Sequence, residues 1–211
     1  MKLRLTRESL KGILRWTQRI LFAAAFSLLA YAGIVVLDAW NFQRTERLRL
    51  EELRTERQAV EDAAPAQPST AVPAIPPPPA EGELVGQLEI PRLDLSVIVV
   101  AGTTKAILRR AAGQIAGTSM PGEPGGNIGI SAHRDTFFRP LRNIRTDDLI
   151  TLTTSAGEYR YRVVSIKVVK PNRVEVLDPD GTEALTLVTC HPFYFVGSAP
   201  NRFIVRANRV E

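Results

Sequence analysis

Hydrophobic positions follow three different patterns along this chain. Ile20–Leu37 is an apolar run of 18 residues without a charge. As a helix it reaches about 27 Å, which matches the hydrocarbon thickness of a bilayer. Residues 41–62 lack Gly and Pro, abound in charged helix formers and carry only a thin apolar stripe, so they predict a helical extension of this run. From residue 81 onward, short stretches of alternating apolar and polar residues are typical of strands.

The alternating part of the chain predicts a mainly β domain. Short helical segments are expected at Thr103–Ala112 and Phe137–Asn143, and the Gly- and Pro-rich stretch Gly113–Gly129 is expected to be largely loop. Short strands separated by Gly, Pro and Asp turns favour a closed barrel or a sandwich. The expected strands are Leu84–Ile90, Leu95–Ala101, Ile128–Ala132, Leu149–Thr154, Glu158–Val169, Val174–Leu177, Ala184–Cys190 and Arg202–Ala207.

The apolar run is expected to be a retained membrane anchor rather than a cleaved signal peptide. Ala30-Tyr31-Ala32 has the small-x-small pattern of a cleavage site, but the apolar run continues for five residues past Ala32. A short coiled coil over residues 41–62 is the alternative to a simple helical extension, although the segment is only three heptads long.

A proline-rich segment separates the helical part from the β domain. Residues 63–80 hold seven of the 15 prolines. This composition excludes helix and sheet, and it favours an extended polyproline II spacer of about 50 Å. The predicted organisation is a basic stub at 1–19, a transmembrane anchor at 20–38, a helical and Pro/Ala-rich stalk at 39–80 and one globular domain at 81–211.

The positive charge of the chain is concentrated at its beginning. Residues 1–19 hold six Lys or Arg and one Glu, which accounts for the whole net charge of +5. A mildly basic domain beside a very basic tip is not the footprint of a nucleic-acid-binding protein. Basic residues before an apolar helix instead orient it with its N-terminus in the cytoplasm. We therefore expect a single-pass protein of the cytoplasmic membrane, in contact with membrane lipid, with its globular domain on the extracytoplasmic side.

The only cysteine, Cys190, lies at the end of an expected strand. A single cysteine excludes an intrachain disulfide. Alternation places Thr186, Val188 and Cys190 on one face of the strand and His191 on the other. A strand end beside a loop suits an exposed nucleophile, whereas most free cysteines are simply small buried hydrophobic residues.

A thiol nucleophile needs a base and a group that stabilises the oxyanion. His133 follows a strand and a Gly-rich loop, 57 residues before Cys190, and is the better candidate for the base because His191 points to the opposite face. Arg202 begins the next strand, so a hairpin would bring it near Cys190. Arg206 shares that strand but lies about 13 Å further along.

Three segments together resemble the sortase family. Thr186–Cys190 (TLVTC) resembles the TLxTC signature, Ser131–Phe138 (SAHRDTFF) resembles the catalytic-histidine segment, and Arg202–Ala207 (RFIVRA) resembles the strand of the active-site arginine. The stretch HPFYFVGSAPNRFIVRA looks most like class D sortases. The resemblance covers about residues 84–209, with the motifs in family order and spacing.

The resemblance implies a mainly β fold, a sortase-type eight-stranded β-barrel with short helices, preceded by one N-terminal transmembrane helix and a Pro-rich stalk. It also implies cysteine transpeptidation in the domain at 81–211. Cys190 would be the nucleophile, His133 the acid and base, and Arg202 the group that orients the substrate and supports the oxyanion. Thr189 would contact the substrate.

Sortases cleave an LPxTG-like signal after its Thr, form a thioester and pass the acyl group to an amine. The implied partners are secreted proteins with such a C-terminal signal and an amine-bearing acceptor of the cell envelope. No cofactor is expected. Some sortases use calcium, and Asp178, Asp180 and Glu183 precede the cysteine strand, but Asp178–Gly181 is more simply a tight turn, so no metal is expected.

Three other functions remain open from the sequence. An anchored coiled-coil scaffold would rest only on residues 41–62. A cysteine endopeptidase would hydrolyse the same signal without transferring it. A non-catalytic anchored module would only bind an extended peptide, and Cys190 would then be structural.

Overall fold

The computed structural model describes residues 7–63, 79–195 and 197–210. Contacts divide the chain into two units, Met1–Asn41 and Phe42–Glu211. Most of the expected proline-rich spacer and the first six residues of the basic stub lie outside the described residues.

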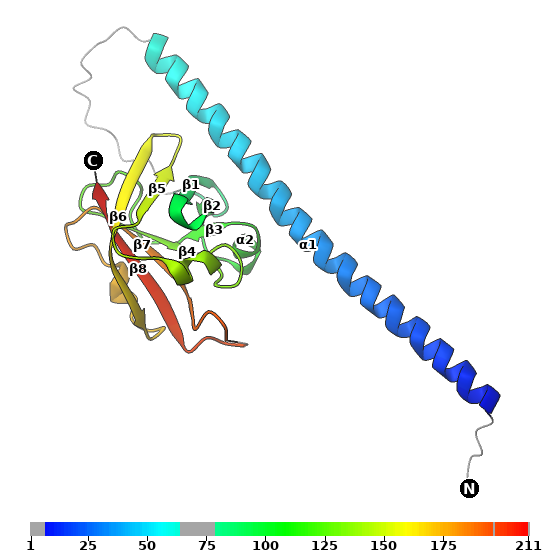
Figure 1. Cartoon of the computed structure of the whole chain (residues 1–211). Helices are drawn as coiled ribbons and strands as arrows, with labels where there is room; N and C mark the ends of the chain where they lie inside the picture. Colours follow the sequence, from blue (N-terminus) through cyan, green and yellow to red (C-terminus); the bar gives the residue numbers. More distant parts are fainter. Residues whose placement is uncertain (1–6, 64–78, 196, 211) are drawn as a thin grey trace. The chain divides into compact units, whose positions relative to one another are not determined.

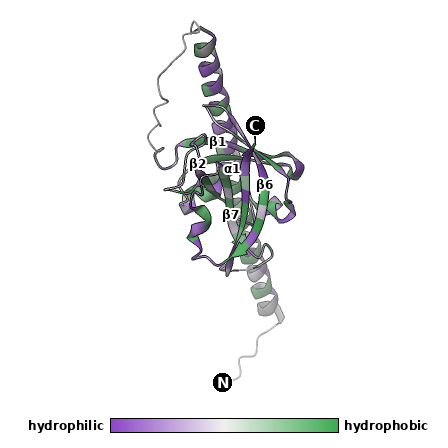
Figure 2. Cartoon of the chain, turned by 90° about the vertical axis from the view of Figure 1, so that its left-hand side faces the viewer, coloured by the Kyte–Doolittle hydropathy of each residue, from purple (hydrophilic) through white to green (hydrophobic). Residues whose placement is uncertain are grey.

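The expected membrane anchor and the expected helical part of the stalk belong to one helix, α1 (Arg7–Ala63). It is the one helix in the described part of the chain that is long and apolar enough to cross a membrane. In Figure 2 the visible part of this helix near its N-terminus carries many hydrophobic residues, and its other end is largely hydrophilic. The large apolar side chains between Ile20 and Leu37 are exposed, as expected for a surface that faces lipid.

The second unit contains a closed eight-stranded barrel, which confirms the predicted fold (Figure 1). The order around the barrel is β1-β2-β3-β4-β7-β8-β6-β5, and β5 pairs back to β1. Only the β2–β3 and β4–β7 pairs are parallel. The strands are β1 (Leu84–Ile90), β2 (Leu95–Ala101), β3 (Ala112–Gln114), β4 (Asn127–Ser131), β5 (Leu149–Thr153), β6 (Glu158–Val169), β7 (Ala184–His191) and β8 (Asn201–Val210).

Short helices fill the connections between the strands. They are α2 (Lys105–Arg110) and the 3₁₀ helices η1 (Pro91–Leu93), η2 (Arg139–Asn143) and η3 (Val174–Leu177). Alternate residues of each strand point into the barrel, where they form the main core. The helical segments predicted at Thr103–Ala112 and Phe137–Asn143 are confirmed as α2 and η2, each with shorter bounds.

The outer face of β2 is also buried. Ile98 and Val100 point away from the main core, yet they are 0% and 1% exposed. They form a second small cluster, against which Phe42 of the second unit packs. The amide of Gln43 accepts from the Ile98 N–H at 2.8 Å and donates to the Arg110 carbonyl at 2.6 Å. The end of α1 that belongs to the second unit is thus in contact with the barrel, inside the segment expected to be stalk.

The strand β3 was not expected, because its residues have no local preference for a strand. Ala112, Gly113 and Gln114 include no β-branched or aromatic side chain. They form a strand because they pair with β2 on one side and β4 on the other. A Cβ at Gly113 would lie 2.1 Å from the Gly102 carbonyl oxygen, so this close approach requires glycine.

The expected strand Val174–Leu177 is wrong, because it forms the 3₁₀ helix η3. Its composition suits a strand, but a strand needs a free neighbouring edge. In the barrel β6 pairs with β5 and β8, and β7 pairs with β4 and β8, so neither offers one. The segment packs over β4 instead, where a Cβ at Gly129 would lie 3.0 Å from Leu177 Cδ2.

An ion pair joins the 3₁₀ helix η1 to the loop before β5. Arg92 donates two hydrogen bonds to the Asp148 carboxylate and a third to the Asn143 carbonyl at 2.7 Å. The Arg145 N–H also donates to Asp148, at 2.8 Å. The Asp148 side chain is only 6% exposed. These bonds, led by the one from Arg92, hold the pKa of Asp148 below its ordinary value of 3.8.

We predict that Asp148→Asn lowers the melting temperature at neutral pH by several degrees, because a charged acceptor is lost where Arg92 remains. A depressed pKa in the folded state stabilises the fold above the ordinary value of 3.8 and ceases to do so as the pH falls through the lower folded value. The deficit of the variant should therefore shrink in acid. Thermal melts from pH 7 to pH 3 measure it.

Asp147→Asn is the matched control for this prediction. Asp147 is exposed and has a φ of 68°, a left-handed conformation that asparagine tolerates. An equal loss of stability in both variants, or a deficit that is independent of pH, would contradict a special role of the Arg92–Asp148 pair.

Candidate active site

Three neighbouring strands position the predicted catalytic residues. The parallel pair β4 and β7 has the register Ser131 opposite Val188, so His133 and Cys190 both follow two residues later at the same edge. The antiparallel pair β7 and β8 places Cys190 directly opposite Arg202. Cys190 thus lies on the central strand of the three, with the histidine segment on one side and the arginine on the other.

His133, Cys190 and Arg202 line one cavity of about 350 Å³. Cys190 is partly exposed and His133 is exposed. Within the described part of the chain no hydrogen bond joins the three side chains, so each is free to interact with a molecule in the cavity. A cavity with a thiol, an imidazole and a guanidinium suits nucleophilic attack on a carbonyl group.

The backbone around His133 is fixed by buried neighbours. Its carbonyl accepts from the Phe138 N–H at 3.1 Å, and Phe138 and Leu141 are both 0% exposed in the barrel core. On the opposite side of the cavity, Nη1 of Arg202 donates to the carbonyls of Asn201 and Ala199, at 3.1 and 3.3 Å. The backbone of His133 and the side chain of Arg202 are therefore held by residues that take no part in the chemistry.

Thr189 does not line this cavity. It is 2% exposed, and its hydroxyl donates to the Ala132 carbonyl at 2.7 Å. This buried bond joins β7 to the residue immediately before His133. The position favours a role in placing His133 over the contact with substrate that the sequence had suggested.

The two rejected candidates lie elsewhere. His191 stacks on Phe203, with ring centroids 6.1 Å apart and an interplanar angle of 10°, and its Nδ1 is buried without a partner in the described part of the chain. Arg206 forms an ion pair with Asp180 at 2.7 Å. Neither residue lines the cavity that contains Cys190.

Five other residues of the cavity wall were not predicted from the sequence. Arg134 and Asp135 directly follow His133, and Gly197, Ser198 and Ala199 belong to the loop between β7 and β8. Arg134 and Asp135 lie inside the quoted histidine segment, which was the available signal. The loop residues lie inside the quoted stretch HPFYFVGSAPNRFIVRA, which indicated the subclass but no role for any one of them.

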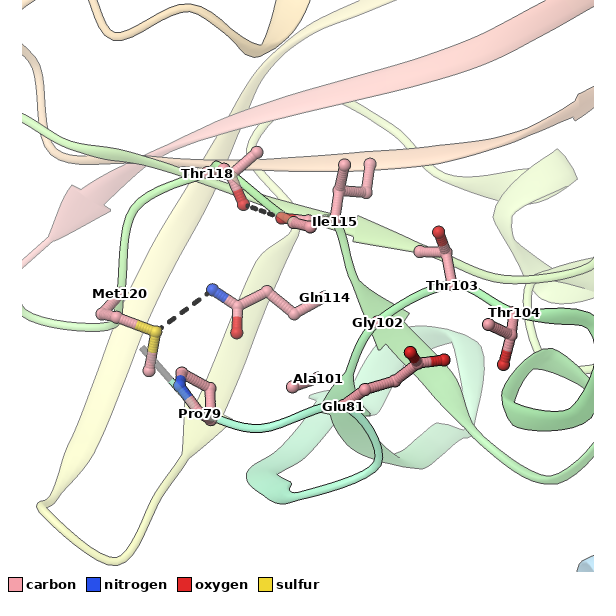
Figure 3. A pocket seen from close by; sticks show the side chains of 12 residues that line it. Pro79, Glu81, Ala101, Gly102, Thr103, Thr104, Gln114, Ile115, Thr118 and Met120 are labelled. Carbon is pink, nitrogen blue, oxygen red and sulfur yellow. Dashed lines mark hydrogen bonds between the residues drawn. The ribbon is translucent and has the colours of Figure 1, made fainter. Parts of the chain in front are cut away.

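A second cavity, of about 390 Å³, lies between the end of β2 and the loop from β3 to β4 (Figure 3). Gln114 on its wall donates to Met120 Sδ at 3.3 Å and to the Ser119 carbonyl at 3.0 Å. Its wall contains neither a cysteine nor a histidine. It therefore lacks the groups for thiol chemistry, and the cavity at Cys190 is the candidate active site.

The described residues contain no group of three His, Cys, Asp or Glu arranged to hold a metal ion. Among the acids before β7, Asp180 accepts from the Thr182 N–H at 3.0 Å in a local turn, besides its bond to Arg206. Glu183 lies 3.9 Å from Arg209.

Comparisons with known proteins agree with this geometry. A family model described as a sortase domain matches residues 88–210. Sortase D of Bacillus subtilis (strain 168) is 35% identical over 133 residues, which cover 63% of this chain and 67% of that protein. These matches confirm the sortase family, and the likeness to Sortase D agrees with the class D resemblance of the sequence motifs.

Solved structures show the same fold. Sortase A from Corynebacterium diphtheriae, a lid mutant, is 27% identical, with a TM-score of 0.59 over 80% of this chain and 95% of that one. A Clostridium perfringens Sortase D5 transpeptidase is 21% identical, with a TM-score of 0.62 over 82% of this chain and 99% of that one. The second likeness concerns the fold alone.

The buried hydroxyl of Thr189 provides a test of the site's support. We predict that Thr189→Val lowers the free energy of unfolding by about 1–3 kcal/mol, because the Ala132 carbonyl loses its side-chain donor in a buried place. Thr189→Ser keeps the hydroxyl and should lose less. A loss in Thr189→Ser as large as that in Thr189→Val, or larger, would show that the packing of the γ-methyl group matters at least as much as the hydrogen bond. Thermal or denaturant unfolding measures both losses.

Proposed function

Because the chain belongs to the sortase family of cysteine transpeptidases, we propose that it cleaves an LPxTG-like sorting signal and joins the acyl fragment to an amine of the cell envelope. The observation that carries this proposal is the register of β4, β7 and β8, which brings His133, Cys190 and Arg202 to one cavity. The partners are secreted proteins with a C-terminal signal and an acceptor that bears a free amine.

In the proposed first step, the thiolate of Cys190 attacks the carbonyl carbon of the scissile peptide bond. Protonated His133 gives its proton to the leaving nitrogen as the C–N bond breaks, which leaves a thioester on Cys190. Nη1 of Arg202 is bonded to backbone carbonyls. The other N–H groups of a guanidinium suit the oxygen that becomes negative in the transition state.

In the proposed second step, an acceptor amine attacks the thioester carbonyl. Neutral His133 takes the proton from the incoming nitrogen, the C–S bond breaks, and the thiolate of Cys190 is restored. The products are a new amide and the free enzyme. Attack by water at the same carbon would release a carboxylic acid instead, so the outcome depends on which nucleophile reaches the thioester.

We predict that the full-length chain in detergent forms an acyl adduct on Cys190 when it is given LPxTG-like peptides, and an amine-joined product when an amine is added. Mass spectrometry detects both species. Cys190→Ala should form neither, and His133→Ala and Arg202→Ala should each reduce kcat/KM by about 100-fold or more, because proton transfer and oxyanion stabilisation are lost.

His191→Ala is the control for the choice of base. His191 stacks on Phe203 outside the cavity, so this variant should keep most of the activity of the folded enzyme. A loss as large as that of His133→Ala would reverse the assignment of the base. Hydrolysed peptide with every acceptor amine, and no joined product, would contradict the transfer step.

The proposed location is the cytoplasmic membrane, with one span and the N-terminus in the cytoplasm. Its support is α1, which is long and apolar enough to cross a membrane, and the basic residues before its apolar run. The natural single cysteine is a reporter of orientation. We predict that a membrane-impermeant maleimide labels Cys190 on intact cells.

The matched control moves the only thiol to the other end of the span. Ser9→Cys in a Cys190→Ala background should be labelled only after lysis, because residue 9 lies in the basic stub. Labelling of Cys190 that also requires lysis would contradict the proposed orientation.

A further inference from the structure

The loop between β7 and β8 forms one wall of the active-site cavity, but its own backbone does little to hold it. Gly197, Ser198 and Ala199 line the cavity beside Cys190. The ladder between the two strands ends at the His191–Asn201 pair. Beyond that pair, no backbone hydrogen bond joins the described residues of this loop to the rest of the domain. Its position therefore depends on side chains from elsewhere.

Arg134 supplies two side-chain hydrogen bonds to this loop. Its Nη2 donates to the Phe195 carbonyl at 2.6 Å and to the Gly197 carbonyl at 2.9 Å. Its guanidinium carbon also lies 5.9 Å from the centroid of the Phe195 ring. Nη1 is buried without a partner in the described part of the chain, so both hydrogen bonds of this side chain go to the loop. Hydrogen bonds from a charged donor are stronger than neutral ones.

These contacts connect two walls of the same cavity. Arg134 directly follows His133, whose carbonyl is tied to the core through Phe138. The loop on the other side continues into Asn201 and Arg202. Both carbonyl acceptors are more than 60 residues away along the chain, 61 for Phe195 and 63 for Gly197. A single guanidinium thus joins the histidine segment to the loop beside Cys190.

We propose that Arg134 is a positioning residue that keeps the β7–β8 loop closed beside Cys190 and thereby favours the acceptor amine over water. This inference rests on the proposed transpeptidation. Both nucleophiles break the same C–S bond of the thioester, one giving an amide and the other a carboxylic acid. Release of the loop widens access for water, which is abundant, and weakens the wall that places the scarce amine.

Two other arginines of the same segment contact this loop only away from the cavity wall or not at all, and they serve as matched controls. Nη1 of Arg142 donates to the Tyr194 hydroxyl at 2.8 Å, but the Tyr194 side chain is 78% exposed and does not line the cavity. Arg139 is exposed, and its side chain has no partner among the described residues. Replacement of either removes one positive charge near the site and leaves the two carbonyl bonds of Arg134 in place.

The test measures the ratio of amide to acid product at several amine concentrations, using the full-length chain in detergent and one cleavable LPxTG-like peptide. We expect Arg134→Ala to lower this ratio by about tenfold, because two charge-assisted hydrogen bonds are lost. Arg142→Ala and Arg139→Ala should keep the ratio of the unaltered enzyme. Arg134→Lys should restore part of it, since an ammonium group can donate to two carbonyls.

The ratio separates a positioning role from a loss of folded protein. Partial unfolding lowers both products together and leaves their ratio unchanged, and a general effect of charge lowers the ratio in all three alanine variants. Either result would overturn the proposal. If Arg134→Ala fails to fold, Arg134→Lys and Arg134→Gln are compared in the same way, and Gln should lower the ratio more than Lys.

Hydrogen exchange gives a second readout that does not depend on activity. Amides of residues 197–199 should exchange faster in Arg134→Ala than in Arg139→Ala, while the amides of β7 should not change. Equal exchange in the two variants would contradict the positioning role of Arg134. An absence of any acyl-enzyme in the unaltered chain would instead defeat the proposed function, so the two failures are distinguishable.

Discussion

The parallel pairing of β4 with β7 is the constraint on which the active site depends. Ile128 and Ile130 of β4 lie opposite Leu185 and Leu187 of β7, and all four are no more than 1% exposed. A slip of one residue would turn these side chains out of the core and reverse the face of every residue on the strand, Cys190 included. The hydrophobic core therefore fixes the level of Cys190 relative to the strand that precedes His133.

Two threonines of the segment that ends at Cys190 strengthen the same pairing. Thr186 donates to the Asn127 side chain at 2.8 Å, and Thr189 donates to the Ala132 carbonyl at 2.7 Å, both in buried surroundings. Asn127 in turn donates to the Val176 carbonyl at 3.3 Å, which ties η3 to the barrel. The polar residues of TLVTC thus join the nucleophile strand to β4. In a shifted register these hydroxyls would be buried without a partner, which would destabilise the fold. The two bonds therefore favour the observed register over its neighbours.

The fold was predictable wherever a segment's own side chains dictate its state. Strand β6 has the bounds that alternation gave it, and the apolar run before residue 38 is helical. Prediction failed where a neighbour decides. Ala112–Gln114 has no local preference for a strand and becomes β3 because β2 and β4 flank it. Val174–Leu177 has the composition of a strand and becomes η3 because no free edge is available.

The sequence by itself determined the order of the chemistry along the chain: an apolar helix, a histidine after one strand, a cysteine at the end of another and an arginine at the start of the next. It also determined that His191 lies on the face opposite Cys190, since alternation is a property of adjacent residues. Only the tertiary structure decided that Arg134 contacts the β7–β8 loop, and that Thr189 is buried against Ala132 rather than exposed in the cavity. Those contacts join residues about 60 positions apart, and they exist only once the register of the barrel has brought their strands together.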